Sequence, residues 1–415
     1  MANNETEVVI VGGGAAGIAA ARRLAMAAID CLVVEARPRL GGRAWTVVDA
    51  FGHTLDLGCG WLHSAERNPW VKIAEDQGRR IDRNPPPWQK AALTLGFPPE
   101  EQQDFMAAMR AFFARVDAVP PDAPDCAAET LLEPGNRWNG MIDAVASYIS
   151  GGNLGRVSIR DFNNYADTEV NWRVVEGYGA TVASYGAALK VALGCPVRQI
   201  HHAGRRVKLE TAKGDIIADQ AIITLPSALI AEREFLFAPT LPDKVAAARG
   251  LPLGLADKVF LSIEGETDFA PDTRLFGRTD RSATATYHLR PFGRPLIEIY
   301  FGGDFAWELE RAGEKAFYDY AQAELARLIG ADFGRRVKPL QMHRWGADPF
   351  ARGSYSFALP GKAECRARLA APVDDKLFFA GEACSEHDFS TAHGGFHTGT
   401  AAADQVIALR RKKRV

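Results

Sequence analysis

A run of glycines between a short apolar strand and an alanine-rich helix constrains this chain more than any other feature. Val8–Val11 is a continuous apolar run of the length that forms a buried strand. The segment Gly12–Gly17 follows at once and has the spacing G-x-G-x-x-G, and Ile18–Met26 then has the pattern of a helix. Cys31–Val34 is a second apolar strand. The order strand, glycine turn, helix, strand predicts a βαβ unit that binds a dinucleotide.

Each glycine of this turn has a separate physical task. Gly12 permits the tight turn, Gly14 lets the backbone approach a pyrophosphate, and Gly17 lets the helix pack closely on the strand. Ala15 and Ala16 stand at the helix N-terminus, where free N–H groups and the helix dipole favour phosphate. We therefore expect the backbone of this turn to contact the cofactor.

The residues after the second strand favour a flavin over a nicotinamide. Glu35 ends that strand about 20 residues after the glycines, where a carboxylate accepts hydrogen bonds from ribose hydroxyls. The segment Arg39–Arg43 then places two glycines between arginines. Gly42 lets the chain run close to a dinucleotide, and the guanidinium of Arg43 can reach phosphate or ribityl oxygens.

Glu35-Ala36-Arg37, followed by Arg39-x-Gly-Gly-Arg43, resembles the flavin-containing amine oxidase family. This family includes monoamine oxidases, polyamine oxidases and flavin histone demethylases. Five further segments are similar to family motifs in the same order, so the resemblance covers the chain from end to end. These segments are 56–69, 175–179, 221–226, 345–356 and 378–395. In motif detail the chain is most similar to the polyamine oxidases.

The resemblance implies FAD as cofactor, held without a covalent bond, because Ser354 stands where monoamine oxidases attach the flavin through a cysteine. It implies that the backbone of Val197 faces the adenine and that Glu382 accepts from a ribityl hydroxyl. It also implies that the last helix, starting near Ala392, directs its N-terminal dipole at the flavin ring, where reduction places negative charge. The implied cofactor contacts are Gly12, Gly14, Ala15, Ala16, Gly17, Glu35, Ala36, Arg37, Gly42, Arg43, Gly58, Gly60, Trp61, Val197, Trp345, Gly381, Glu382, Thr391 and Ala392.

The same resemblance implies five catalytic or substrate-contacting residues. Lys258 matches the lysine that holds a water against flavin N5, and Tyr355 matches one wall of an aromatic cage beside the flavin. Thr391 takes the place of the other wall, which is often aromatic. His63 matches a pocket histidine of animal polyamine oxidases, and Trp61 completes the set.

The function implied is FAD-dependent oxidation of an amine C–N bond to an imine, by hydride transfer to flavin N5. Reoxidation by O2 would give hydrogen peroxide, and the substrate would be a polyamine or another primary or secondary amine. An L-amino-acid oxidase on the same scaffold stays open, because Arg173, Arg278 or Arg290 could pair with a substrate carboxylate. A desaturase-type flavoenzyme and a non-catalytic flavin-binding interaction protein are further alternatives.

The expected fold is an α/β FAD-binding domain, Rossmann-type and glutathione-reductase-like, interleaved with an α+β substrate-binding domain. We expect a helix over 98–118, strands within 195–225, 256–264 and 284–301, and one long helix over 306–329. The FAD-binding segments are predicted at 1–80, 195–235 and 360–415, and the substrate-domain segments at 81–194 and 236–359.

Composition and charge limit the partners. Lys and Arg number 49 against 51 Asp and Glu, so neither nucleic acid nor an anionic membrane is expected as a partner. No apolar run approaches about 18 residues and no signal peptide is expected, so we predict a cytoplasmic protein. The six cysteines form no C-x-x-C pair and no metal site is expected. The amine substrate and O2 are the expected partners, and the chain could be a monomer or a homodimer.

Overall fold

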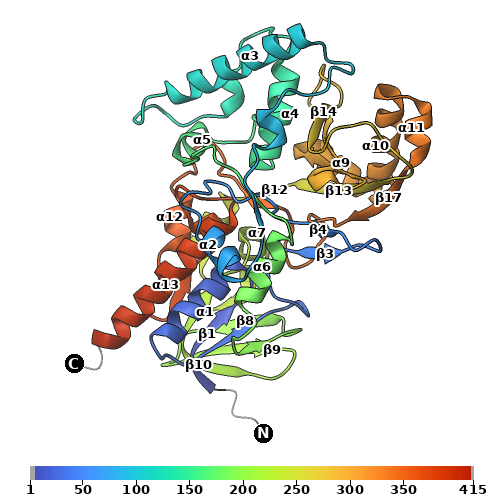
Figure 1. Ribbon diagram of the computed structural model, residues 1–415. Coiled ribbons are helices and arrows are strands. Elements are labelled where there is room, and N and C mark those ends of the chain that lie inside the picture. The colour runs from blue at the N-terminus through green and yellow to red at the C-terminus, as the bar shows by residue number, and fades with distance from the viewer. Residues whose placement is uncertain (1–4, 413–415) are drawn as a thin grey trace.

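The computed structural model describes residues 5–412, which form a lower and an upper part in the view of Figure 1. The lower part contains an eight-stranded sheet, and both described ends of the chain lie there. The upper part contains a five-stranded sheet and most of the helices between 99 and 336. The chain passes between the two parts several times, so that each is built from segments far apart in the sequence.

The eight-stranded sheet brings together the beginning, the middle and the end of the chain. Its order is β11-β8-β9-β10-β1-β2-β7, and β19 pairs with β10. β1 pairs in parallel with β2 and β10, and β10 pairs in parallel with β19. Strands buried on both faces need continuous apolar runs, which these have. The strands are β1 Glu5–Val11, β2 Cys31–Val34, β7 Val191–Ala192, β8 Val197–His201, β9 Val207–Thr211, β10 Ile216–Ile223, β11 Phe237–Ala238 and β19 Leu377–Phe379.

Two helices pack against each other beside this sheet, α1 (Ala15–Met26) and α13 (Ala392–Lys412). Their small residues permit a close crossing: a Cβ on Gly399 would lie 2.1 Å from the carbonyl oxygen of Ala16. Val8 and Ile10 of the sheet share a buried apolar cluster with alanines of both helices. The N-termini of α1 and α13 therefore lie close together, with Gly395 next to Ala16.

The five-stranded sheet is antiparallel, with the order β14-β15-β16-β13-β17. One face is apolar and packs against helices α9 to α11, as residues such as Val259 and Ile299 show. Because side chains alternate along a strand, the other face carries Lys258 and Glu298. The elements are β13 Ala256–Ile263, β14 Thr273–Phe276, β15 Ala285–Leu289, β16 Leu296–Gly302, β17 Val337–Met342, α9 Gly303–Ala312, α10 Glu314–Leu328 and α11 Ala331–Arg336.

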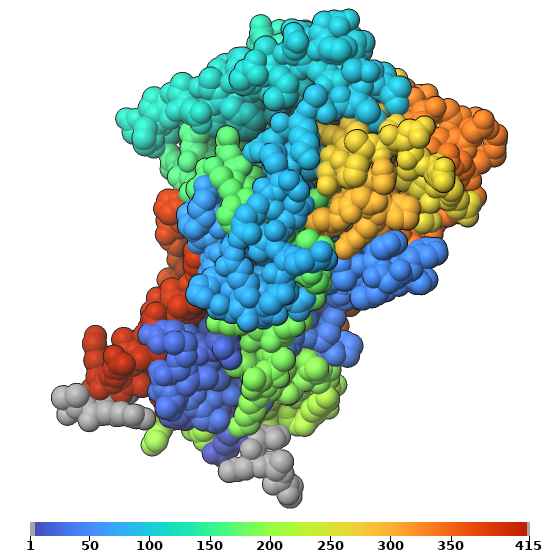
Figure 2. Space-filling model, in the orientation of Figure 1, coloured from blue at the N-terminus to red at the C-terminus, as the bar shows by residue number. Residues whose placement is uncertain are grey.

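The remaining elements surround these two sheets. Helix α3 forms the top of the molecule in Figure 1, with α4 and α5 below it, and these helices contribute to an aromatic cluster that includes Phe105 and Trp138. Figure 2 shows the β3–β4 hairpin, in blue, projecting at one side. The helices are α2 Pro69–Asp76, α3 Pro99–Asp117, α4 Asn139–Ser150, α5 Ile159–Asn164, α6 Tyr178–Tyr185, α7 Ser227–Glu232, α8 Pro242–Arg249 and α12 Cys365–Ala370. The strands are β3 Thr46–Val48, β4 Thr54–Asp56, β5 Ile81–Asp82, β6 Arg173–Val174, β12 Leu253–Gly254 and β18 Tyr355–Ser356. Five short 3-10 turns are η1 Pro87–Gln89, η2 Ala128–Leu131, η3 Glu234–Leu236, η4 Pro291–Gly293 and η5 Glu382–Cys384.

The βαβ unit predicted at the N-terminus is confirmed, and α3 matches the helix predicted over 98–118. The single helix predicted over 306–329 is wrong, because α9 and α10 are separate helices. Gly313 lies between them with φ of +100°, a conformation that interrupts a helix. The mixed sheet with its covering helices agrees with the α/β class, and the five segment boundaries stay a prediction. Over residues 5–412, no helix combines the length and the hydropathy needed to cross a bilayer.

Candidate active site

The glycine turn leaves free space at one of the three glycines that define its G-x-G-x-x-G spacing. Gly12 has φ of +110°, and a Cβ on Gly17 would lie 1.9 Å from the oxygen of Gly12, so the fold itself requires both glycines. A Cβ on Gly14 would meet nothing closer than 3.9 Å, where Gly41 and Gly42 lie. This space stands at the N-terminus of α1, whose first turn holds no acidic residue. It is the space that a pyrophosphate would fill.

Glu35 is buried and fixed beside this turn. Its Oε2 accepts from the backbone N–H of Gly13 at 2.7 Å, and its Oε1 accepts from that of Arg37 at 2.7 Å. A carboxylate oxygen can accept a second hydrogen bond, so both oxygens can still receive ribose hydroxyls. The guanidinium of Arg37 is paired with Asp348 at 2.6 Å. The N–H of Cys195 donates to the carbonyl of Glu35, which brings the chain just before β8 to this edge.

Arg43, which is partly buried, and Glu382, which is buried, form a pair across 339 positions of sequence. Arg43 Nη1 lies 2.9 Å from Glu382 Oε1 and also donates to the carbonyl of Ser354. The other carboxylate oxygen accepts from the hydroxyl of Ser356 at 2.6 Å. Burial raises the pKa of Glu382, but Arg43 and Ser356 lower it more, so the net shift is downward and the group stays ionised. Sequence reasoning identified Arg43 and Glu382 separately but not their contact.

Thr391 is the N-cap of α13. Its Oγ1 accepts from the N–H of Gly394 at 2.9 Å and donates to the carbonyl of Asp388 at 2.6 Å. Threonine directly before a helix is a typical N-cap, and this signal in the sequence was missed. The hydroxyl therefore fixes where the helix starts, at Ala392, and so where its dipole points.

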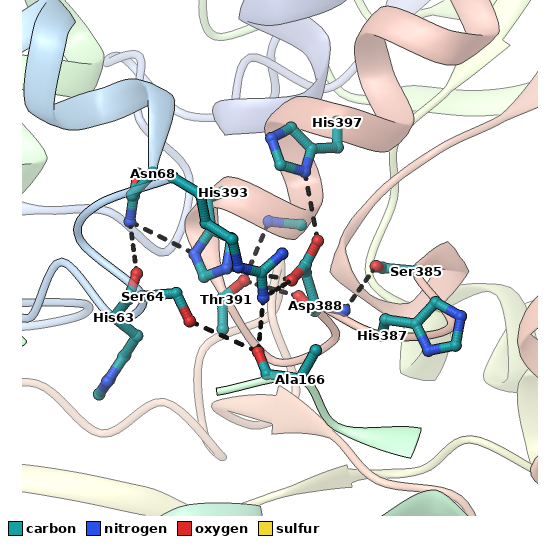
Figure 3. A network of polar contacts seen from close by, with 12 residues as sticks. His63, Ser64, Asn68, Ala166, Ser385, His387, Asp388, Thr391, His393 and His397 are labelled. Carbon is teal, nitrogen blue, oxygen red and sulfur yellow. Dashed lines mark hydrogen bonds and ion pairs between the residues drawn. The ribbon is translucent and has the colours of Figure 1, made fainter. Parts of the chain in front are cut away.

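A cluster of charged and polar groups surrounds Asp388 just before this helix (Figure 3). The carboxylate lies 2.7 Å from Arg67 Nη2, 3.2 Å from His397 Nδ1 and 3.5 Å from His393 Nε2. The neighbouring His393 and His397 hold the pKa of Asp388 well below its usual range. Asn68 joins the cluster to the pocket segment, because its amide donates to the carbonyl of His63.

The loop Gly58–Trp61 runs between Arg43, Trp345 and Lys258. A Cβ on Gly58 would lie 1.7 Å from the carbonyl oxygen of Arg43 and 3.2 Å from the Trp345 ring. A Cβ on Gly60 would lie 3.1 Å from Lys258 Nζ. Gly58 is therefore required by its close backbone neighbour, and a side chain at Gly60 would press on the end of Lys258. The structure thus brings the loop and Lys258 together, as the sequence-based assignment needs.

Lys258 is buried, with 5% of its side chain exposed. Its Nζ lies 3.3 Å from Glu298 Oε1, yet over residues 5–412 it has no hydrogen-bond partner of good geometry. A buried ammonium with unused donors is costly unless another group accepts from it. This orphaned donor beside Gly60 and the free space at Gly14 fit the FAD predicted from the sequence.

Aromatic and polar side chains lie near the same loop. The rings of Trp61 and Trp88 meet edge to face with centroids 4.4 Å apart. His63 Nδ1 lies 2.6 Å from the side-chain oxygen of Asn171, and burial lowers the pKa of His63, which keeps the ring neutral. The hydroxyl of Tyr355 donates to the carbonyl of Tyr148. Asn171 and Tyr148 carry no motif, and sequence reasoning missed them.

Sequence reasoning also missed Glu298 and His288. In the strand 296–302, Ile297, Ile299 and Phe301 share one apolar face, and a glutamate on the opposite face was the available signal. A pocket with about 420 Å³ of empty volume, open to solvent at its mouth, lies beside Trp61 and reaches Glu298 and Arg173.

Comparison with known proteins gives one family and a consistent set of relatives. A family described as flavin containing amine oxidoreductase matches residues 15–144 and 133–407. Polyamine oxidase 4 of Oryza sativa subsp. japonica is 28% identical over 96% of this chain and 88% of its own length. Polyamine oxidase 2 of Arabidopsis thaliana is 27% identical over 97% and 88%. Lysine-specific histone demethylase 2 of Homo sapiens is 24% identical over 97% of this chain and 53% of its own length.

Proposed function

Because the chain belongs to the flavin-containing amine oxidoreductases, a family of FAD-dependent enzymes, we propose that it oxidises a polyamine or another primary or secondary amine. The observation that carries the proposal is Lys258, a buried ammonium without a hydrogen-bond partner over residues 5–412, which faces Gly60 beside the cofactor cradle. The curated relatives include several polyamine oxidases, which supports an amine as the substrate class.

In the proposed reaction the amine loses a hydride from its α-carbon and becomes an iminium, which water hydrolyses. O2 takes up the two electrons with two protons and becomes hydrogen peroxide. Bound FAD would supply the hydride acceptor and pass the electrons on. The residues that would hold it are those of the turn around Gly14, Glu35 at the ribose, and the Arg43–Glu382 pair at the ribityl chain, with no covalent bond at Ser354.

The chain's own side chains would select a neutral amine. The reacting nitrogen must release its proton, because its lone pair forms the imine. The aromatic rings of Trp61 and Trp88 would first attract the substrate as an ammonium, by about 0.5–2 kcal/mol. Once water is excluded, the same apolar surroundings would favour the neutral amine over the ammonium. His63 is neutral and bonded to Asn171, so it adds no positive charge that would repel the substrate. Lys258 would hold a water in front of the acceptor atom.

The arginine contacts favour an amine over an amino acid. A substrate carboxylate needs an arginine whose charge is not already balanced, but Nη2 of Arg173 pairs with two aspartates, although its Nε and Nη1 have no hydrogen-bond partner over residues 5–412. Arg278 pairs with Asp280 at an exposed position, and Arg290 donates to two backbone carbonyls. The three arginines that the sequence offered for this role therefore all have other partners.

The deciding experiment is anaerobic bleaching of the flavin of the purified holoprotein by a panel of amines. We expect polyamines, or another group of primary or secondary amines, to bleach the flavin, and peroxide to form when air is admitted. The L-amino acids serve as the comparison panel. Bleaching by amino acids alone would favour the amino-acid oxidase. If polyamines, aryl-alkyl amines and cyclic amines all failed to bleach the flavin, the proposal would be overturned.

The role of Lys258 is tested separately with Lys258→Met. Loss of the ammonium should slow reoxidation in air more than it slows bleaching, because the cation assists the transfer of electrons to O2. Lys338→Met is the matched control, since Lys338 lies in the same sheet with its ammonium exposed. Equal slowing of both half-reactions by Lys258→Met would contradict the role.

A further inference from the structure

Five charged side chains and the ring of His288 form a row that ends at Lys258. Neighbours in the row lie between 2.7 and 3.5 Å apart, and each side chain is between 5 and 14% exposed. In order along the row the members are Asp82, Arg173, Asp272, His288, Glu298 and Lys258. Charges buried in this way are tolerated when each has a partner of opposite sign.

The register of the five-stranded sheet builds the inner half of this row. His288 of β15 stands directly opposite Glu298 of β16. Lys258 of β13 stands opposite Tyr300, two residues beyond Glu298 on the same strand, so the lysine and the glutamate are diagonal neighbours on one face. The opposite face of these strands is apolar and covered by helices. The side chains of Lys258, His288 and Glu298 therefore meet on the face that Lys258 shares with the proposed site.

Glu298 is held on both of its oxygens. Oε1 accepts from the hydroxyl of Tyr300 at 3.2 Å and faces Lys258, and Oε2 faces His288 Nδ1 at 3.5 Å. The other ring nitrogen of His288 lies 2.9 Å from Asp272. Burial alone would raise the pKa of Glu298, but Lys258 and His288 lower it by more. The pKa is about 2 as a result, so the carboxylate is charged at neutral pH.

Asp56 is the second carboxylate near Lys258, and its oxygens accept hydrogen bonds from other groups. Asp56 Oδ1 and Oδ2 accept from the backbone N–H groups of Gly179 and Tyr178 at 3.1 and 2.9 Å. Oδ1 also accepts from the hydroxyl of Thr46 at 2.5 Å. Glu298 is thus the carboxylate that forms an ion pair with Lys258 over residues 5–412.

We propose that Glu298 is a positioning residue that holds the ammonium of Lys258 in front of Gly60, and that His288 and Asp272 in turn hold Glu298. The inference rests on the proposed function, because the task of Lys258 is part of it. Removing the charge of Glu298 leaves Lys258 in the sequence but frees its ammonium to move away from the acceptor.

The kinetic test uses Glu298→Gln, which keeps the side-chain shape. The holoenzyme is reduced by light with EDTA as the electron donor, so that no amine substrate is needed, and reoxidation by O2 is followed per bound flavin. We expect Glu298→Gln and Lys258→Met each to slow reoxidation about tenfold. Glu324→Gln is the control, because Glu324 is buried on α10, beyond the apolar face of the sheet, where Tyr287 contacts it. Wild-type reoxidation in Glu298→Gln beside slow reoxidation in Lys258→Met would overturn the inference.

Thermal unfolding of the apoprotein gives a readout without cofactor or turnover. Lys258→Met and Glu298→Gln each leave one buried group without its partner, so the double variant should lose less in Tm than the sum of the single losses. Lys258→Met combined with Glu324→Gln should show additive losses. Additivity in the first pair would also overturn the inference. A holoenzyme that no amine bleaches refutes the proposed function alone, since neither measurement here uses an amine.

Discussion

Replacing Gly399 by alanine should lower the free energy of unfolding by about 2 kcal/mol, although alanine is the better helix residue. A Cβ at this position would lie 2.1 Å from the oxygen and 2.8 Å from the carbonyl carbon of Ala16, both backbone atoms that cannot rotate away. Overpacking of this kind costs about 3 kcal/mol at the upper end of its range. Exchange of glycine for alanine inside a helix stabilises the helix by about 1 kcal/mol, which leaves a net loss of about 2 kcal/mol.

Gly395→Ala is the matched control, one turn earlier on α13. Its Cβ would lie 3.6 Å from the nitrogen of Ala16, an ordinary contact, so this variant should gain up to about 1 kcal/mol. Urea unfolding of both apoproteins, followed by circular dichroism, measures the difference. Equal stability of the two variants would refute the reasoning that the α1–α13 crossing is limited by this glycine. In the holoprotein, Gly399→Ala should also weaken FAD retention, because Ala16 stands in the first turn of α1.

Three further outcomes follow from buried charges and from the cofactor. As pH falls from 4.5 to about 2, Glu298 becomes protonated and loses its stabilising contribution. The free energies of unfolding of wild type and Glu298→Gln, measured by urea denaturation, should therefore approach each other by about 3 kcal/mol. A constant difference between the two proteins over this pH range would contradict this. Arg366→Met leaves Asp161 buried without its 2.7 Å partner and should cost about 3–5 kcal/mol, with partial recovery when Asp161→Asn is added; Tm measurements that show no recovery would disprove the pairing. Removal of FAD should lower Tm, and FAD at about 100 times its Kd should restore about 2.7 kcal/mol; an unchanged Tm would exclude binding to the folded state.

Local signals predicted the nucleotide turn well. The spacing of Gly12 and Gly17 follows from steric contacts inside one βαβ unit, so the sequence alone predicts it. The start of α13 was predicted within a residue, because glycines and alanines dominate the segment, yet the capping role of Thr391 was missed. Gly313 was also available as a helix-breaking signal between α9 and α10.

Contacts between segments far apart in the chain could not be predicted from local sequence patterns. The Arg43–Glu382 pair depends on which strands neighbour each other, and no local pattern encodes that choice. Glu298 meets Lys258 only because β13 and β16 pair in one particular register. A shift by one residue would turn Glu298 to the apolar face, so this part of the site is a product of the whole sheet.

The placement of β19 and α13 has a consequence for synthesis. β10 pairs with β1, made first, and with β19, made near the end, and α13 packs on α1. A polypeptide that the ribosome has extended only to residue 376 therefore has the glycine turn but not the helix that faces it. Cofactor capture should require β19 and α13, and a premature stop before residue 377 would yield a product that stays colourless however much riboflavin the cell receives.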